Sequence, residues 1–82
     1  MLKELRLSKG LSQSQLAVGS GVNLHMIQKY EQGVKDINHA KLETLLKLCN
    51  ILNCSLCELI NDPKLEELVE TYEARMKGDN NG

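Results

Sequence analysis

Two short helical segments joined by a glycine-containing turn occupy residues 11–33, and this stretch constrains the fold more than any other. Ser12 can cap the first segment by accepting a hydrogen bond from a free N–H group, and Gln15 stands where it can return a bond to the cap. Residues 19–21 (Gly-Ser-Gly) are expected to end that helix, because glycine adopts left-handed backbone conformations at little cost. Asn23 then caps a second helix, which is expected to end at Gly33.

The second of these helices has two unlike faces. Ile27 and Tyr30 fall three residues apart on one side, as core residues of a helix do. The other side carries Leu24, His25, Gln28 and Lys29. A polar face by itself is most often only solvated. Two helices across a tight turn, with polar groups in the first turn of the second, are nevertheless the geometry that places a helix in the DNA major groove.

Hydrophobic spacing predicts more helices on both sides of this unit. Residues 1–8 form a first helix that ends before Gly10, and Asn38 is expected to cap a longer helix that reaches Leu52. Asn53 occupies the place of a left-handed C-terminal residue, and Ser55 can cap a further short helix. The apolar stripe of the longer helix is expected to comprise Leu42, Leu45, Leu46, Cys49 and Leu52. The predicted fold class is all-α, since no segment alternates as a strand does.

A last helix is predicted to begin at Pro63, with Asp62 as its cap, and to reach about Lys77. Its apolar residues could pack on the same domain or pair with a second copy of the chain, and both readings stay open. These residues are Leu65, Leu68, Val69, Tyr72 and Met76. The domain organisation expected is residues 1–61 as one domain, residues 62–77 as a helical extension, and residues 78–82 as a disordered tail.

Charge is distributed unevenly along the 82 residues, whose net charge is −1. Residues 1–60 carry seven Lys or Arg against five Asp or Glu, whereas residues 61–82 carry three against six. The first part is therefore weakly basic, as binding to phosphates requires, and the acidity belongs to the last helix. No apolar run is long enough for a membrane span, and the first ten residues lack the apolar block of a signal peptide, so a cytoplasmic protein without membrane contact is expected.

The run LSQSQLAVGSGVNLHMIQKYEQG, followed by Leu42, Leu45, Leu48 and then LNCSLCELI, resembles the helix-turn-helix domain of the phage-repressor and Cro type. The resemblance covers about residues 2–60. It implies a five-helix domain that binds double-stranded operator DNA, usually as a homodimer on a palindrome, and here the domain is followed by the sixth helix. A small transcriptional regulator, most simply a repressor that occludes polymerase, is the function expected from it.

The resemblance also assigns roles to single residues. Gln13 matches a glutamine that typically contacts a phosphate and braces the reading helix. Asn23, Leu24, His25, Gln28 and Lys29 match positions that face bases or the adjacent backbone, and Gln32, Lys35 and His39 match positions that follow the sugar-phosphate chain. Leu24 departs from the commoner polar residues, and leucine could contact only a thymine methyl group. Arg6 and Glu31 match an ion pair that ties the first helix to the end of the reading helix.

Other kinds of site receive weaker support from the sequence. Cys54 and Cys57 have zinc-like spacing, with Cys49 upstream, but no second such pair exists and the nearest histidine, His39, is distant. Buried, reduced thiols are therefore expected at Cys49 and Cys54, and no metal, cofactor, small-molecule effector or enzymatic activity is predicted. The competing function is an antitoxin-like or adaptor module, in which the acidic last helix binds another protein and DNA binding is autoregulatory or lost.

Overall fold

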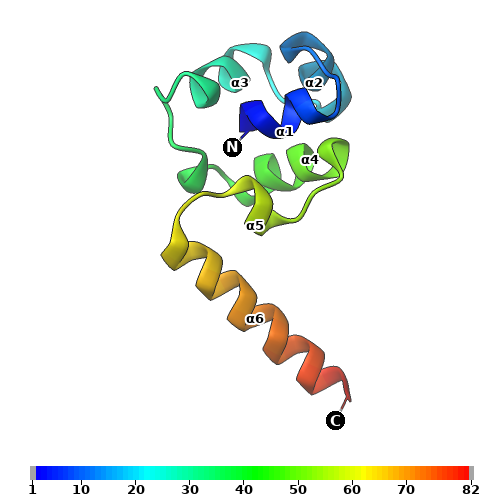
Figure 1. Cartoon of the computed structure of the whole chain (residues 1–82), viewed down its shortest axis with the longest axis vertical. Helices are drawn as coiled ribbons and strands as arrows, with labels where there is room; N and C mark the ends of the chain where they lie inside the picture. The colour runs from blue at the N-terminus through cyan, green and yellow to red at the C-terminus, as the bar shows by residue number, and fades with distance from the viewer. Residues whose placement is uncertain (1, 82) are drawn as a thin grey trace.

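The computed structural model describes residues 2–81, with side chains for residues 2–77, and this part of the chain contains helices and connections but no strand. The elements are α1 (Leu2–Ser8), α2 (Gln13–Ser20), α3 (Leu24–Glu31), the short 3₁₀ turn η1 (Ile37–His39), α4 (Leu42–Leu52), α5 (Leu56–Leu59) and α6 (Pro63–Asn81). The all-α fold class is confirmed: a domain of five helices is followed by a sixth helix. Figure 1 shows α2 and α3 at one end of the molecule and α6 projecting from the other.

The core of the five-helix domain is aliphatic and is built where α2 packs on α3 and α4, and α4 packs on α5. Its fully buried side chains come from all four of these helices and the residue after α5, and they are Leu16, Ile27, Leu48, Leu52, Leu59 and Ile60. Burying each of them contributes roughly 1.5–3 kcal/mol relative to solvent exposure. Helices this short are marginal in isolation, so this shared core is what holds α2 and α3 in place.

Hydrogen-bonded caps fix the starts of α2 and α5 as the sequence predicts. The Ser12 hydroxyl accepts from the Gln15 N–H at 3.0 Å, and the Gln15 side chain accepts from the Ser12 N–H at 2.8 Å. Ser55 and Glu58 form the same reciprocal pair at the start of α5. Each pair satisfies two backbone donors that the first turn of a helix leaves without a partner.

The predicted start of α4 is wrong. Asn38 lies in η1, whose cap is Asp36, and α4 begins only at Leu42, after Lys41. The Asp36 carboxylate accepts from the Asn38 N–H at 3.0 Å, so Asp36 caps the 3₁₀ turn that precedes α4. Asn38 instead bonds to the chain after α5, where its side-chain oxygen accepts from the Asn61 N–H at 2.8 Å. The extra turn also buries Ile37 before the helix begins.

The buried stripe of α4 is also rotated from the predicted one. Leu42 and Leu46 are 61% and 45% exposed, whereas Leu48 is fully buried. The buried face is Leu45, Leu48, Cys49 and Leu52. A helix this rich in leucine offers two overlapping apolar stripes, and packing against α2 selects the one that contains Leu48.

Residues 19–21 were expected to end α2, but the first glycine of this segment has a packing role instead. Gly19 lies inside α2, and a Cβ atom placed there would come within 2.8 Å of the Ile51 side chain of α4. Gly21 performs the termination: its φ of 75° is left-handed, and its N–H donates to the Ala17 carbonyl. The first glycine therefore allows α2 and α4 to approach closely, and the second ends the helix.

The last helix continues beyond the predicted end at Lys77 to Asn81. Its start is as expected, because the Asp62 carboxylate accepts from the Lys64 N–H at 3.0 Å just after Pro63. The side chains of residues 78–82, where the tail is expected, lie outside the described part. No helix in the described residues is both long and apolar enough to span a membrane.

Candidate nucleic-acid interface

The turn between α2 and α3 is held by local hydrogen bonds that fix the direction in which α3 begins. After Gly21, the Ser20 hydroxyl accepts from the Val22 N–H at 3.1 Å, and Val22 is buried. The Asn23 side chain then accepts from the His25 N–H at 2.7 Å, which caps α3 as predicted. The two helices therefore form one unit whose relative orientation is set by the turn as well as by the core.

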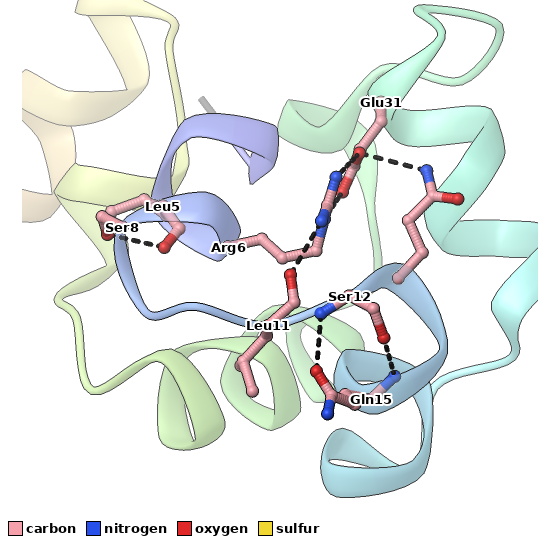
Figure 2. A network of polar contacts seen from close by, with 8 residues as sticks. Leu5, Arg6, Ser8, Leu11, Ser12, Gln15 and Glu31 are labelled. Atoms are coloured by element: carbon pink, nitrogen blue, oxygen red, sulfur yellow. Dashed lines mark hydrogen bonds and ion pairs between the residues drawn. The ribbon is translucent and has the colours of Figure 1, made fainter.

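A buried ionic cluster holds the other end of α3, as Figure 2 shows. The Arg6 side chain of α1 donates to both carboxylate oxygens of Glu31, at 2.8 and 2.9 Å, and to the Leu11 carbonyl at 2.8 Å. Gln13, at the start of α2, donates to the same carboxylate at 3.2 Å. The predicted Arg6–Glu31 ion pair is thus present, and the Arg6 and Glu31 side chains are only 9% and 4% exposed.

The cluster stabilises the charged forms of its members. Burial acts to raise the pKa of Glu31, but hydrogen bonds from Arg6 and Gln13 outweigh it and hold the pKa below its ordinary value of 4.5. The hydrogen bond with Glu31 raises the pKa of Arg6. Since the three residues belong to α1, α2 and α3, the cluster ties all three helices together at the C-terminal end of α3.

We call the outward side of α3 the reading face, formed by Leu24, His25, Gln28 and Lys29. His25 is exposed and the other three are half-buried, while the opposite side of the helix buries Ile27 completely. Within the described part of the chain, the side chains of the reading face form no hydrogen bond. Their donors and acceptors are therefore available to a ligand. The last helix packs on α5, away from α2 and α3, and leaves this face open (Figure 1).

The remaining candidate residues flank the reading face rather than belonging to it. Gln13 is half-buried and turned toward Glu31, while Asn23, at the start of α3, is exposed. Gln32 and Lys35 are exposed beyond the end of α3. The structure therefore brings the candidates to one end of the molecule, from the start of α2 to the loop after α3.

An open groove of about 410 Å³ lies next to the reading face, between α3 and the start of α4. Met26 and Tyr30 form part of its apolar wall, and the Lys35 ammonium lies 3.6 Å from the Met26 sulfur. The rim also carries Lys41, together with Asp36 and His39, whose side chains lie 3.6 Å apart, so two lysines and one carboxylate line the groove. Lys41 is a candidate that the sequence reasoning missed, since the predicted helix start at Asn38 placed it inside a helix instead of at the N-terminus.

The N-terminus of α4 adds to the positive character of this groove. Lys41 is its N-cap residue and provides no side-chain hydrogen bond to the first turn. The free N–H groups of the first turn and the helix dipole both favour an anion there. The carboxylates of α6 belong to the far end of the molecule, so the net charge of −1 combines an acidic last helix with a weakly basic five-helix domain.

The cysteines lie apart from this surface, around the junction of α4, α5 and α6. Cys49 is buried, whereas Cys54 and Cys57 are half-buried, and all three are free thiols. Burial raises the pKa of Cys49 to about 12, helped by the neighbouring Cys54 and Glu58. Among the described residues, no group of three or more His, Cys, Asp or Glu side chains is arranged to hold a metal ion.

Comparison with known families gives a match over most of the chain. A family model described as helix-turn-helix matches residues 2–59, which covers α1 to α5. Neither the curated proteins nor the solved structures compared with the chain gave a match. The matched segment ends before α6, so the comparison bears on the five-helix domain.

Proposed function

The chain belongs to the helix-turn-helix family of the Cro/C1 type, which comprises DNA-binding transcriptional regulators, and from this premise we propose that it binds a specific operator through α3. The observation that carries the proposal is the reading face: it is open, its polar groups are unused, and the helix beneath it is fixed at both ends. A rigid helix with free donors and acceptors is what base-edge recognition in the major groove requires.

Roles on the reading face follow from the chemistry of each side chain. Lys29 can donate to guanine O6 and N7, and His25 can donate to an acceptor edge. Gln28 can form paired hydrogen bonds with adenine, in which its side-chain oxygen accepts from N6 and its amide nitrogen donates to N7. Leu24 offers no hydrogen-bonding group and would contact a thymine methyl. These four residues would therefore select sequence, and the largest part of that selection would come from Lys29 and Gln28.

Phosphate contacts would come from residues on either side of α3. Gln13 and Asn23 lie near the helix N-termini of the α2–α3 unit, where an anion is favoured. Gln32 and Lys35 follow α3, and Lys41 lines the adjacent groove at the start of α4. Contacts of this kind position a protein on the duplex and supply affinity without reading the bases.

We also propose that the active form is a homodimer that represses transcription by occupying a palindromic operator. Two copies related by a two-fold axis would place their α3 helices in successive major grooves, about ten base pairs apart. Selecting bound fragments from random DNA tests the proposal: a two-fold symmetric consensus with half-sites one helical turn apart is expected. Failure to enrich any sequence would refute it.

One observation favours a second candidate function, a protein-interaction module of the antitoxin or adaptor type. The last helix is acidic and keeps large apolar side chains exposed, as a surface for another protein would. Capture of one partner in stoichiometric amount, together with no DNA enrichment, would favour this function over the repressor.

A further inference from the structure

The last helix leaves most of its apolar surface without a partner. α5 packs against its beginning, and from there α6 extends away from the five-helix domain (Figure 1). Leu65 and Val69, near α5, are half-buried. Further along, Leu68 is 67% exposed, Tyr72 62% and Met76 36%. Most of the stability of a helix in a protein comes from packing its apolar side, so this exposed surface favours a partner.

The exposed residues and the half-buried ones share one side of the helix. We call Leu65, Leu68, Val69, Tyr72 and Met76 the apolar row, since the spacing of three and four residues aligns them. At about 100° per residue, Glu66 and Glu73 border the row along one edge, with Lys77 behind them near the end of the helix, and Arg75 borders it along the other, with Lys64 behind it. The row is thus flanked by acid on one side and by base on the other.

These unlike edges distinguish between the two ways in which two copies of α6 can pair. In an antiparallel pair, like edges meet, so Glu66 of one copy would lie beside Glu73 of the other, twice in each dimer. In a parallel pair, opposite edges meet, and the acidic edge lies beside Leu68 and Arg75 of the second copy. Juxtaposed like charges disfavour an arrangement, so the flanking charges select the parallel one.

We propose that a second copy of this chain covers the apolar row, with the two α6 helices parallel about a two-fold axis. This pairing gives the homodimer of the proposed function a definite interface, on which the inference rests. A parallel pair keeps both five-helix domains at the same end of the dimer. Both α3 helices then lie at the end away from the C-termini, as simultaneous contact with one DNA duplex requires.

Sedimentation equilibrium of the full chain without DNA tests whether the row is the interface. Leu68→Glu/Tyr72→Glu places charge in the centre of the row and is expected to raise the dimer dissociation constant at least about tenfold. Far-ultraviolet circular dichroism should show that the five-helix domain still folds, since both residues are exposed in the single chain. A wild-type chain that stays monomeric at high micromolar concentration overturns the proposal, and so does a double variant that dimerises as the wild type does.

Charge reversal at the edges tests the direction of pairing. Glu66→Lys/Glu73→Lys makes both edges basic and is expected to weaken the dimer at least about fivefold at low salt. Adding Lys64→Glu/Arg75→Glu restores unlike edges and should restore the dimer. In an antiparallel pair, like edges would meet in the wild type, in the double variant and in the quadruple variant. Equal dimer dissociation constants for these three proteins therefore overturn the parallel arrangement.

A matched control separates edge contacts from net charge. Glu67→Lys/Glu70→Lys changes the charge by the same amount on the side of α6 away from the row, and its dimer should be unchanged. Weakening of the dimer equal to that of the edge variant overturns the proposal.

The measurement of dimerisation is made without DNA, so an intact dimer that selects no operator refutes the proposed function alone. A monomeric chain that still selects a palindrome refutes this pairing alone.

Discussion

Removing either member of the buried ion pair should destabilise the fold by about as much as removing both members together. Glu31→Gln keeps the shape of the side chain but takes the charge away from Arg6, whose guanidinium is almost fully enclosed. Arg6→Met leaves the Glu31 carboxylate with only the bond from Gln13. In each single variant, a charge stays buried without its partner, whereas the double variant contains neither charge.

The structure sets the size of the effect. Two hydrogen bonds at 2.8 and 2.9 Å join charged groups, and each such bond contributes about 1.5–3 kcal/mol. Breaking a buried pair from one side costs about 3–5 kcal/mol, and the Gln substitution keeps one acceptor, so about 3 kcal/mol is expected for each single variant. The double variant should also lose about 3 kcal/mol, which makes the coupling energy about 3 kcal/mol. A domain of this size has roughly 4–12 kcal/mol in total, so each single variant would lose a large share.

Urea unfolding of the wild type, the two single variants and the double variant, followed by circular dichroism, measures this coupling. The exposed pair Glu43–Lys47, 3.1 Å apart, provides the control, and Glu43→Gln should change stability by less than about 0.5 kcal/mol. A coupling energy for Arg6 and Glu31 below about 0.5 kcal/mol would refute the reasoning, because it would mean that the two charges are solvated independently.

The same cluster predicts a dependence on pH. The pKa of Glu31 is lower in the folded protein than its ordinary value of 4.5, so its contribution to stability is present above that pH and is lost as the pH falls through the folded value. Glu31→Gln removes this contribution. Its unfolding free energy should therefore fall less than that of the wild type between neutral pH and pH 3, and parallel declines for the two proteins would contradict the assignment.

Three further predictions concern the interface, the turn and the core. Lys29→Ala should relax base preference at one operator position, whereas Lys35→Ala should weaken binding to all sequences alike. Lys35→Ala should also reduce the slope of log affinity against log salt concentration by about one. Equal effects of the two variants in a DNA-binding assay would refute their separate roles. Gly21→Ala forces a Cβ into a left-handed conformation and should cost about 1–2 kcal/mol in urea unfolding, while an unchanged midpoint would mean that the turn relaxes. Cys49, with a pKa of about 12, should react with iodoacetamide at pH 8 at least about tenfold more slowly in the folded protein than in urea, and equal rates would show that it is accessible.

Local hydrogen-bonding chemistry made much of the fold predictable from the sequence. Ser12 and Gln15, Asn23, and Asn53 are residues whose side chains or backbone preferences act within a few positions, and each is found in its predicted role. The start of α4 was not predictable, because Asp36 caps a 3₁₀ turn that contains Asn38, and Asn38 bonds to Asn61, a residue distant in the sequence. The side of α4 that is buried depended in turn on where α2 packs. Sequence patterns contain neither kind of information.

In the candidate site, too, the residues that depend on local structure were predictable from sequence patterns and those that depend on distant contacts were not. The order of residues in α3 was sufficient to separate Ile27 from the reading face, because helical periodicity is a local property. Arg6 and Glu31 could be paired only through a family resemblance, since they are 25 residues apart in the chain. Lys41 was missed because its place at the N-terminus of α4 follows from the unexpected turn before that helix.

The separation of acidic and basic residues described above has a consequence for how the protein approaches DNA. With almost no net charge, the molecule is only weakly attracted to a polyanion from a distance. Its excess positive charge at one end and negative charge at the other, along a 44 Å axis, nevertheless form an electric dipole. On the proposed function, that dipole would experience a torque in the field of a duplex that turns α3 toward the phosphates, so productive orientation would begin before any contact is made.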